Sequence, residues 1–205
     1  MIIIDILYFM LTTFIVAEFI GYWLHVLLHS GTVRWLSKNH MIHHITIYGP
    51  GQNQRPKDDY IHSVINRFGI FDLGIEWLVP ITILIPITAM FEHYVLRFGW
   101  IEIVCSIIFI LAYSWVMFSW LHGQHHCLST SKIIRKSPRL IKRQFIRARK
   151  FHDIHHHYVN NKGLMNRNYG IGFCMFDKLF GSHMPTLKGG INKESIKRVK
   201  ERYRL

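Results

Sequence analysis

The chain has 205 residues and carries 25 Lys and Arg against 12 Asp and Glu, which gives a formal net charge of +13. Half of its residues are hydrophobic, and they gather in three blocks that are each long enough to cross a bilayer core, which takes about 20 helical residues. This distribution excludes an ordinary soluble domain. The three cysteines are scattered without a C-x-x-C spacing, so neither a disulfide framework nor a thiolate metal site is predicted.

The first apolar block covers residues 2–28 and contains only Asp5, Glu18 and His25 as ionisable interruptions. It lacks the basic start and the small-residue cleavage site of a signal peptide, so we expect a retained membrane span. Its last turns carry His25 and His29, which are four residues apart and therefore share one face of a helix. Two roles are equally open to Glu18, two turns before His25: orienting that histidine, or a buried hydrogen bond to a neighbouring helix.

A short helix over residues 35–44 is predicted after the first span, and it would present the cluster His40-Met-Ile-His43-His44. The next stretch, residues 48–59, is rich in turn-forming and polar residues and is predicted to be a loop.

The second and third spans are predicted at residues 71–90 and 101–121, joined by a tight loop near residues 92–97. The short connection makes these two spans an antiparallel hairpin. Glu76, near the start of the second span, has the same two open roles as Glu18. The third span leads directly into the cluster His122-Gly-Gln-His125-His126.

Residues 132–150 hold nine Lys and Arg and no acid. Within them Ile141, Phe145 and Ala148 follow helical spacing, and the same stripe continues into the fourth cluster, His152-Asp-Ile-His155-His156-His157. We predict an amphipathic helix at the membrane surface, with its basic side on lipid headgroups and its inner face toward the histidines. This placement argues against nucleic acid as the partner of the basic residues.

The charge distribution gives the topology. If the N-terminus lies outside, three spans place 24 of the 25 Lys and Arg in the cytoplasm, with Arg97 as the exception, in agreement with the positive-inside rule. The same topology puts all four histidine clusters on that side. The predicted fold is therefore all-α: a single domain over residues 1–205, built as a multi-pass transmembrane helical bundle with a cytoplasmic histidine-rich helical cap of residues 29–70 and 122–205.

The four clusters contain twelve of the 15 histidines. Random placement would give roughly 0.08 copies of H-x-x-H-H, whereas the chain has three, so the pattern is a strong signal. On a helix this spacing puts three imidazoles on one side, and neutral imidazole binds iron, zinc, copper and nickel. About ten ligands exceed the needs of one zinc or one haem. Two adjacent metal ions would use them.

The series HVLLH, HMIHH, HGQHH and HDIHH, followed by NYGIGFCMFDKLFGS, resembles the fatty acid hydroxylase/sterol desaturase superfamily from about residue 21 to 183. The resemblance implies a membrane non-haem di-iron oxygenase, with two iron ions as cofactor and O₂ as co-substrate. Carried over position by position, it implies as metal ligands His25, His29, His40, His43, His44, His122, His126, His152, His155 and His156.

The resemblance and the spacing also bear on the remaining candidate residues. In the third cluster the pair His122 and His126 is favoured, and the role of His125 stays open. Asp153, between ligands, is expected to orient one of them, and Asn168 and Asp177 to organise the turn after the last cluster. Ordinary polar roles are expected for His62, His93, His157 and His183. The chain departs from the family pattern at Phe176-Asp177-Lys178, where relatives usually read W-D-R.

The expected function is hydroxylation or desaturation of a fatty acyl or sterol-like lipid taken from the bilayer. No fused cytochrome b5 domain is present, so electrons are expected from a separate donor, a reductase system of cytochrome b5 or ferredoxin type. The expected location is a bacterial inner membrane or the endoplasmic reticulum, with the active site on the cytoplasmic side. The alternatives are an ether-lipid- or aldehyde-cleaving relative and a non-catalytic metal- or haem-binding membrane protein.

Overall fold

The computed structural model describes residues 2–59, 69–70, 73–187 and 192–205, and the side chains of residues 4–59, 80–187 and 192–205. These residues are mostly helical. The extended structure found among them is one antiparallel pair of two-residue strands, β1 (Gly69–Ile70) and β2 (Leu73–Gly74). The predicted all-α class therefore agrees with the described part of the chain.

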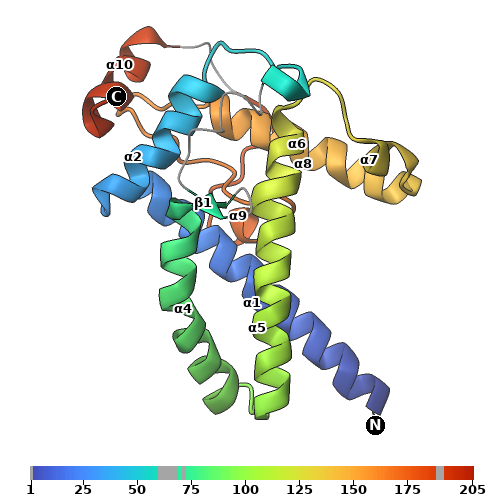
Figure 1. Ribbon diagram of the computed structural model, residues 1–205. Helices are drawn as coiled ribbons and strands as arrows, with labels where there is room; N and C mark the ends of the chain where they lie inside the picture. The colour runs from blue at the N-terminus through green and yellow to red at the C-terminus, as the bar shows by residue number, and fades with distance from the viewer. Residues whose placement is uncertain (1, 60–68, 71–72, 188–191) are drawn as a thin grey trace.

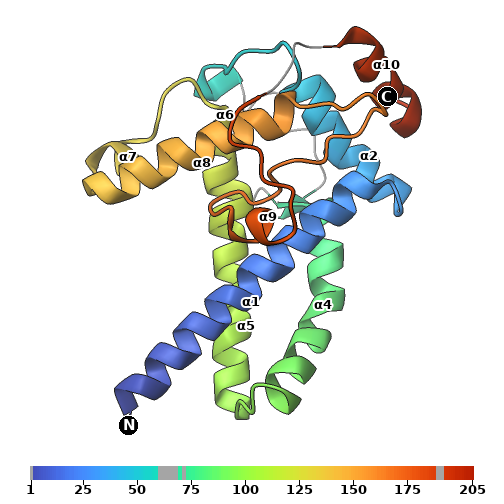
Figure 2. The ribbon, with the colours of Figure 1, turned by 180° about the vertical axis from the view of Figure 1, so that it is seen from behind.

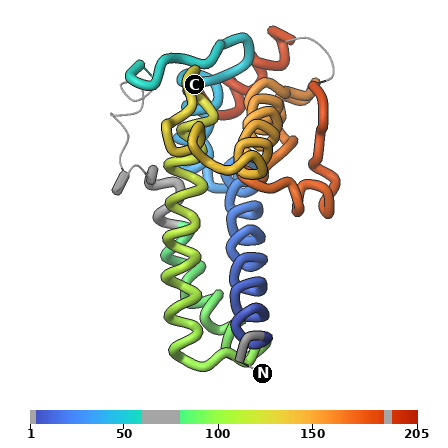
Figure 3. The backbone as a smooth tube through the Cα atoms, turned by 90° about the vertical axis from the view of Figure 1, so that its right-hand side faces the viewer, coloured from blue at the N-terminus to red at the C-terminus, as the bar shows by residue number. Residues whose placement is uncertain are grey.

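Three long helices make the lower part of the molecule (Figure 1): α1 (Ile2–Ser30), α4 (Ile75–Tyr94) and α5 (Trp100–Trp115). The last continues without a break through the π-helix η2 (Val116–Leu121) into α6 (His122–His126). Helix α1 crosses α5 diagonally, and α4 and α5 form a hairpin at the end where the N-terminus lies. In the side view of Figure 3, both α1 and α5 run through the lower part of the molecule.

Two of these stretches, Ile4–Ser30 and Trp100–His126, are long and apolar enough to cross a membrane among the described residues. Their outward side chains fit that environment, since Leu7 and Leu11 on α1 and Ile101 on α5 are at least 60% exposed. A soluble protein would not leave such a continuous apolar surface uncovered. The crossing by α4 stays a prediction.

The boundaries of the second span differ from the sequence prediction. Helix α4 begins at Ile75, after the strand pair, rather than at residue 71, and it continues to Tyr94. Glu92, expected in the connecting loop, therefore lies inside the helix, where it is fully buried and accepts a hydrogen bond from Ser106 of α5. The connection is tighter than expected because Glu102 caps the start of α5, accepting from the backbone N–H of Gly99 at 2.6 Å.

The remaining helices form a cap at the end opposite the N-terminus (Figure 2). They are α2 (Arg34–Ile42), the π-helix η1 (His43–Ile47), α7 (Lys132–Lys136), α8 (Arg139–His157), α9 (Met175–Leu179) and α10 (Lys193–Tyr203). Helix α8 lies crosswise above the long helices, and α9 with its flanking turns lies beside α1. The C-terminal helix α10 closes the cap, packing Val199 and Tyr203 on Met41 of α2.

The inner stripe predicted for α8 is present in part. Phe145 and Ala148 are buried and lead into the buried histidines of the last turns. Ile141 is 53% exposed, although it lies on the same stripe, because the first turns of α8 extend sideways beyond the long helices (Figure 1).

Candidate metal centre

Four helical segments bring the histidine clusters to one place, the junction between the long helices and the cap. The last turns of α1 carry the first cluster, α2 with η1 the second, α6 the third and the end of α8 the fourth. Both π-helical segments, η1 and η2, adjoin a cluster, and π-turns inserted in helices are frequent at functional sites. Eleven cluster histidines are at most 9% exposed: His25, His29, His40, His43, His44, His122, His125, His126, His152, His155 and His156.

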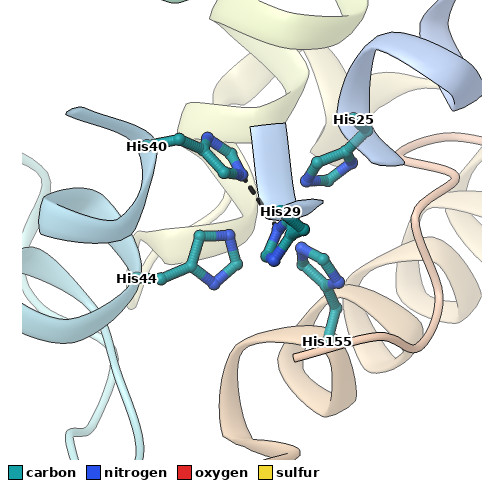
Figure 4. A group of neighbouring side chains, drawn as sticks. All are labelled: His25, His29, His40, His44 and His155. Carbon is teal, nitrogen blue, oxygen red and sulfur yellow. Dashed lines mark hydrogen bonds between the residues drawn. The ribbon is translucent and has the colours of Figure 1, made fainter. Parts of the chain in front are cut away.

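The first histidine group consists of five residues whose ring nitrogens lie within 4.8 Å of one another. Figure 4 shows their rings converging on a common centre from α1, α2, η1 and α8. The Nε2 atoms of His29 and His40 are 3.0 Å apart. The members are His25, His29, His40, His44 and His155.

The second histidine group lies beside the first and contains four residues that meet the same limit of 4.8 Å: His43, His122, His126 and His156. His152 lies next to this group, with its Nε2 atom 3.1 Å from that of His126, although it falls outside the 4.8 Å set. The two groups touch, since the ring of His44 stacks on that of His156 with centroids 3.9 Å apart and planes 6° apart.

The orientation of three rings fits metal binding. A backbone carbonyl faces Nδ1 in each of them: that of Tyr169 for His25 at 2.5 Å, that of Arg167 for His155 at 2.6 Å, and that of Tyr48 for His156 at 2.7 Å. A ring that donates from Nδ1 presents an unprotonated Nε2 on its other side, which is the usual arrangement of a histidine ligand.

The ring nitrogens of several group members are buried without a hydrogen-bond partner among the described residues. These atoms are Nε2 of His155 and of His156, Nδ1 of His29, and both nitrogens of His44. A buried polar atom without a partner costs about 1–3 kcal/mol, so several of them in two adjacent groups are explained best by metal ions that accept the lone pair of one nitrogen of each ring.

The electrostatics of the cap favour the neutral, ligating form of these rings. Burial lowers the pKa of His40, His44 and His156 well below the ordinary histidine value, and it lowers the pKa of His155 to about 4. Each is therefore uncharged at neutral pH, as a metal ligand must be. Among the described residues both groups are built of imidazole alone, without a carboxylate or a thiolate.

The turn after α8 holds the first group, in the way predicted for Asn168 and Asp177. The carboxylate of Asp177 accepts from the backbone N–H of Tyr169 at 2.7 Å and of Gly170 at 2.8 Å, and from the hydroxyl of Ser182 at 2.6 Å. Asn168 adopts a left-handed conformation with φ of 53°, which asparagine tolerates, and its side chain bonds both backbone groups of Met184.

Hydrogen bonds join α1 to α5 and to α10. The carboxylate of Glu18 accepts a hydrogen bond from Tyr113 on α5, so of its two open roles the structure supports the bond between helices. The orienting partner of His25 is the carbonyl of Tyr169 instead. On the other side, Tyr203 of α10 donates to the carbonyl of His29 at 2.6 Å. Glu76 lies in α4 among the residues whose side chains are not described.

Among the described residues, the histidines expected to have ordinary polar roles lie outside both groups, as does His125, whose role was open. His125 is buried outside both sets, with its ring centroid 5.2 Å from that of Phe145 and 5.1 Å from that of His152, both on α8. His93 stacks on Trp100 at the far end of the long helices, and His157 bonds two backbone carbonyls of the cap. His183 packs on Phe151. His62 lies outside the described residues.

Sequence reasoning missed the residues that support the second group, above all Tyr48, Gln54 and Arg149. Tyr48 is buried, and its ring lies 4.6 Å from that of His126. The one signal in the sequence was the helical spacing of Arg149, Asp153 and His157, which places three polar side chains on one face of α8.

A family model described as fatty acid hydroxylase matches residues 10–182, which is most of the chain and includes every histidine of both groups. No curated protein and no solved structure matches the chain.

Proposed function

Since the chain belongs to the fatty acid hydroxylase family, we propose that it is a membrane oxidoreductase that uses O₂ and two iron ions to hydroxylate or desaturate a C–H bond of a lipid. The observation that supports this most strongly is the pair of adjacent, buried, all-imidazole groups. Two iron ions in such ligand sets would supply the redox chemistry for O₂ activation, and the protein's part is ligand geometry and a dry site.

The ten histidines expected from the sequence divide between the two ions. His25, His29, His40, His44 and His155 would hold one, and His43, His122, His126 and His156 the other, with His152 as its fifth ligand. Proximity of the two ions follows from the stacking of His44 on His156. Backbone carbonyls hold three of these rings with Nε2 turned inward, so little reorganisation is needed when metal binds.

A small apolar cavity lies between α1, α4 and α5, with room for about one water molecule, so an alkyl chain from the bilayer would have to widen it. It begins about a turn and a half below His25, since Ile20 on α1 lines it and lies five residues earlier at about 1.5 Å per residue. Its lining is almost entirely aliphatic: Ile20, Ile81, Leu84, Ile85, Thr88, Ile107, Ile110 and Leu111.

The proposal places the histidine groups at the cytoplasmic face of a bacterial inner membrane or of the endoplasmic reticulum, in keeping with the positive-inside distribution. Electrons would come from a separate donor, a reductase system of cytochrome b5 or ferredoxin type.

The test is metal content by mass spectrometry of detergent-purified protein, followed by lipid profiling of expressing cells. We expect two iron ions per chain in the wild type and none in the double variant His155→Ala/His156→Ala, because one ligand is removed from each group. We also expect no Soret band, which a haem protein would show. One ion or none in wild-type protein purified without chelators would overturn the di-iron proposal.

A further inference from the structure

The second histidine group depends on a loop that is neither helix nor strand. His156 is oriented by the carbonyl of Tyr48, 2.7 Å from its Nδ1 atom. Tyr48 begins the loop of residues 48–55 that follows η1, which we name the clamp loop. A backbone carbonyl orients a ring only as firmly as its own segment is held, so the contacts of the clamp loop determine the position of His156.

One face of α8 holds the clamp loop through three side chains spaced four residues apart. Asp153 accepts from the hydroxyl of Tyr48 at 2.9 Å. One turn later, His157 faces the carbonyl of Gln52 with its Nε2 atom at 3.2 Å. One turn earlier, Arg149 donates to the side-chain oxygen of Gln54 and to the carbonyl of Cys127. The loop is thus bonded along its length by the helix that carries His156.

The clamp loop is also bonded to α6 and the residues after it. The backbone N–H of Arg55 donates to the carbonyl of His126 at 3.3 Å, and that of Leu128 donates to the carbonyl of Arg55 at 2.7 Å. The amide of Gln54 donates to the carbonyl of His125 at 3.3 Å. The loop therefore joins η1, α6 and α8, which are the three elements that supply the second histidine group.

The first histidine group has a different support. The turn of residues 167–184 faces His25 and His155 with its carbonyls, and Tyr22 of α1 is hydrogen-bonded to Ser182 of the same turn at 3.0 Å. Asp177 holds this turn from inside. Each group thus has its own loop and its own organising aspartate: Asp177 for the first group and Asp153 for the second.

We propose that Asp153 and Tyr48 are positioning residues for the second metal ion alone, and that the clamp loop makes the retention of this ion separable from that of the first. The inference rests on the proposed function for the presence of two ions. Tyr48 and Asp153 touch neither ion. They act through the Tyr48 carbonyl on His156, and the ring of Tyr48 packs against His126 of the same group.

The test uses three variants of the full-length protein in detergent. Asp153→Ala removes the acceptor for Tyr48, Tyr48→Phe removes only the hydroxyl, and Asp153→Asn retains an oxygen that can still accept. Lys150→Ala is the matched control, because Lys150 is exposed on the same helix. Each protein is dialysed against graded chelator, and the metal remaining per chain is measured together with the circular dichroism spectrum.

We expect Asp153→Ala and Tyr48→Phe to release one ion at a chelator concentration about 10 to 100 times lower than the wild type requires, and to keep the other ion as the wild type does. Asp153→Asn is expected to lie between, and Lys150→Ala to match the wild type. Unchanged circular dichroism and retention of one ion show that the variants fold, and Tyr48→Phe repeats the test with a smaller change.

Double variants identify which ion is lost. His155→Ala leaves only the second position, so adding Asp153→Ala is expected to empty the protein at the lower chelator concentration. His156→Ala leaves only the first position, so adding Asp153→Ala is expected to change nothing. Simultaneous release of both ions, or release at the wild-type concentration, would overturn the inference and leave the proposed function standing. Fewer than two ions in the wild type would overturn both.

Discussion

Replacing Asp177 tests whether one buried carboxylate maintains the first histidine group. Asp177 is fully buried in the turn of residues 167–184 and accepts three hydrogen bonds, two of them from the backbone N–H groups of Tyr169 and Gly170. The carbonyl of that same Tyr169 is 2.5 Å from Nδ1 of His25. Losing the carboxylate should therefore destabilise the cap and, through Tyr169, loosen a ligand.

The magnitude follows from the three bonds. Hydrogen bonds to a charged partner contribute roughly 1.5–3 kcal/mol each. Burial raises the pKa of Asp177, which shows that holding its carboxylate away from water costs free energy. Part of the stabilisation from the three hydrogen bonds offsets this cost, and removing the carboxylate removes the cost as well. The net loss in Asp177→Ala should be about 3–5 kcal/mol. Asp177→Asn keeps one acceptor oxygen but turns an N–H₂ group toward one donor, so its loss should be smaller, about 1.5–3 kcal/mol.

The assay is the apparent melting temperature in one detergent, measured for wild type and both variants, with metal content on the same samples. For a chain of this size 1 kcal/mol corresponds to about 2–4 °C, so Asp177→Ala should melt roughly 10 °C lower and Asp177→Asn about half as much lower. The first ion should be lost more readily than the second. A melting temperature within about 2 °C of the wild type, with both ions retained, would refute the reasoning.

Three further predictions follow from other parts of the cap. His152→Ala should lower the metal content from two ions to one, because the Nε2 atom of His152 lies 3.1 Å from that of His126. His125→Leu should leave two ions, because His125 lies outside both sets. Metal analysis of both variants tests these expectations. The metal-free protein should lose stability as the pH falls from 6.5 to about 4. Burial lowers the pKa of His155 to about 4, so in this window the unfolded chain binds more protons than the folded one. His155 alone should account for a loss of about 3 kcal/mol in the free energy of unfolding, which chemical denaturation at several pH values would measure. Tyr203→Phe should lower the free energy of unfolding by about 1 kcal/mol, because the hydrogen bond to the His29 carbonyl is lost. Val199→Ala should lower it further, because it opens a cavity beneath α10. The Val199→Ala protein should therefore have the lower melting temperature of the two.

The sequence predicted what helical spacing alone controls. His25 and His29, four residues apart in an apolar helix, had to lie on one face, and the three H-x-x-H-H clusters had to present their rings together. Local composition also predicted the long helices, and the family resemblance of the tail indicated the turn around Asn168 and Asp177. The start of α4 was misplaced because the apolar run begins at Phe71, in the sequence between β1 and β2, whereas the helix begins only after β2, at Ile75.

Contacts between residues far apart in the chain could not be predicted, because the spacing of residues along one helix does not encode them. The backbone carbonyls of Tyr48, Arg167 and Tyr169 face rings of the two histidine groups, and the contacts of a carbonyl cannot be read from the identity of its residue. The exposure of Ile141 depends on how far α8 extends beyond the bundle, which spacing does not encode. Glu18 left two roles open because its partner, Tyr113, is 95 residues away in the chain.

The division of the histidines shows how one motif contributes to two groups. At about 100° per residue, positions i and i+4 lie about 40° apart on a helix, and position i+3 lies about 60° to the other side of i. In the second cluster His40 and His44 join the first group, while His43 joins the second.

In the fourth cluster the assignment is reversed: His152 and His156 lie on the side of the second group, and His155 joins the first. Pairs spaced i, i+4 come from α1 for the first group and from α6 for the second. Each group therefore receives two such pairs and one i+3 residue, which makes five and five once His152 is counted. The i+3 residue of α6, His125, falls outside both sets, with its ring centroid 5.2 Å from that of Phe145 and 5.1 Å from that of His152. The same symmetry argues that His152, rather than His125, completes the second group.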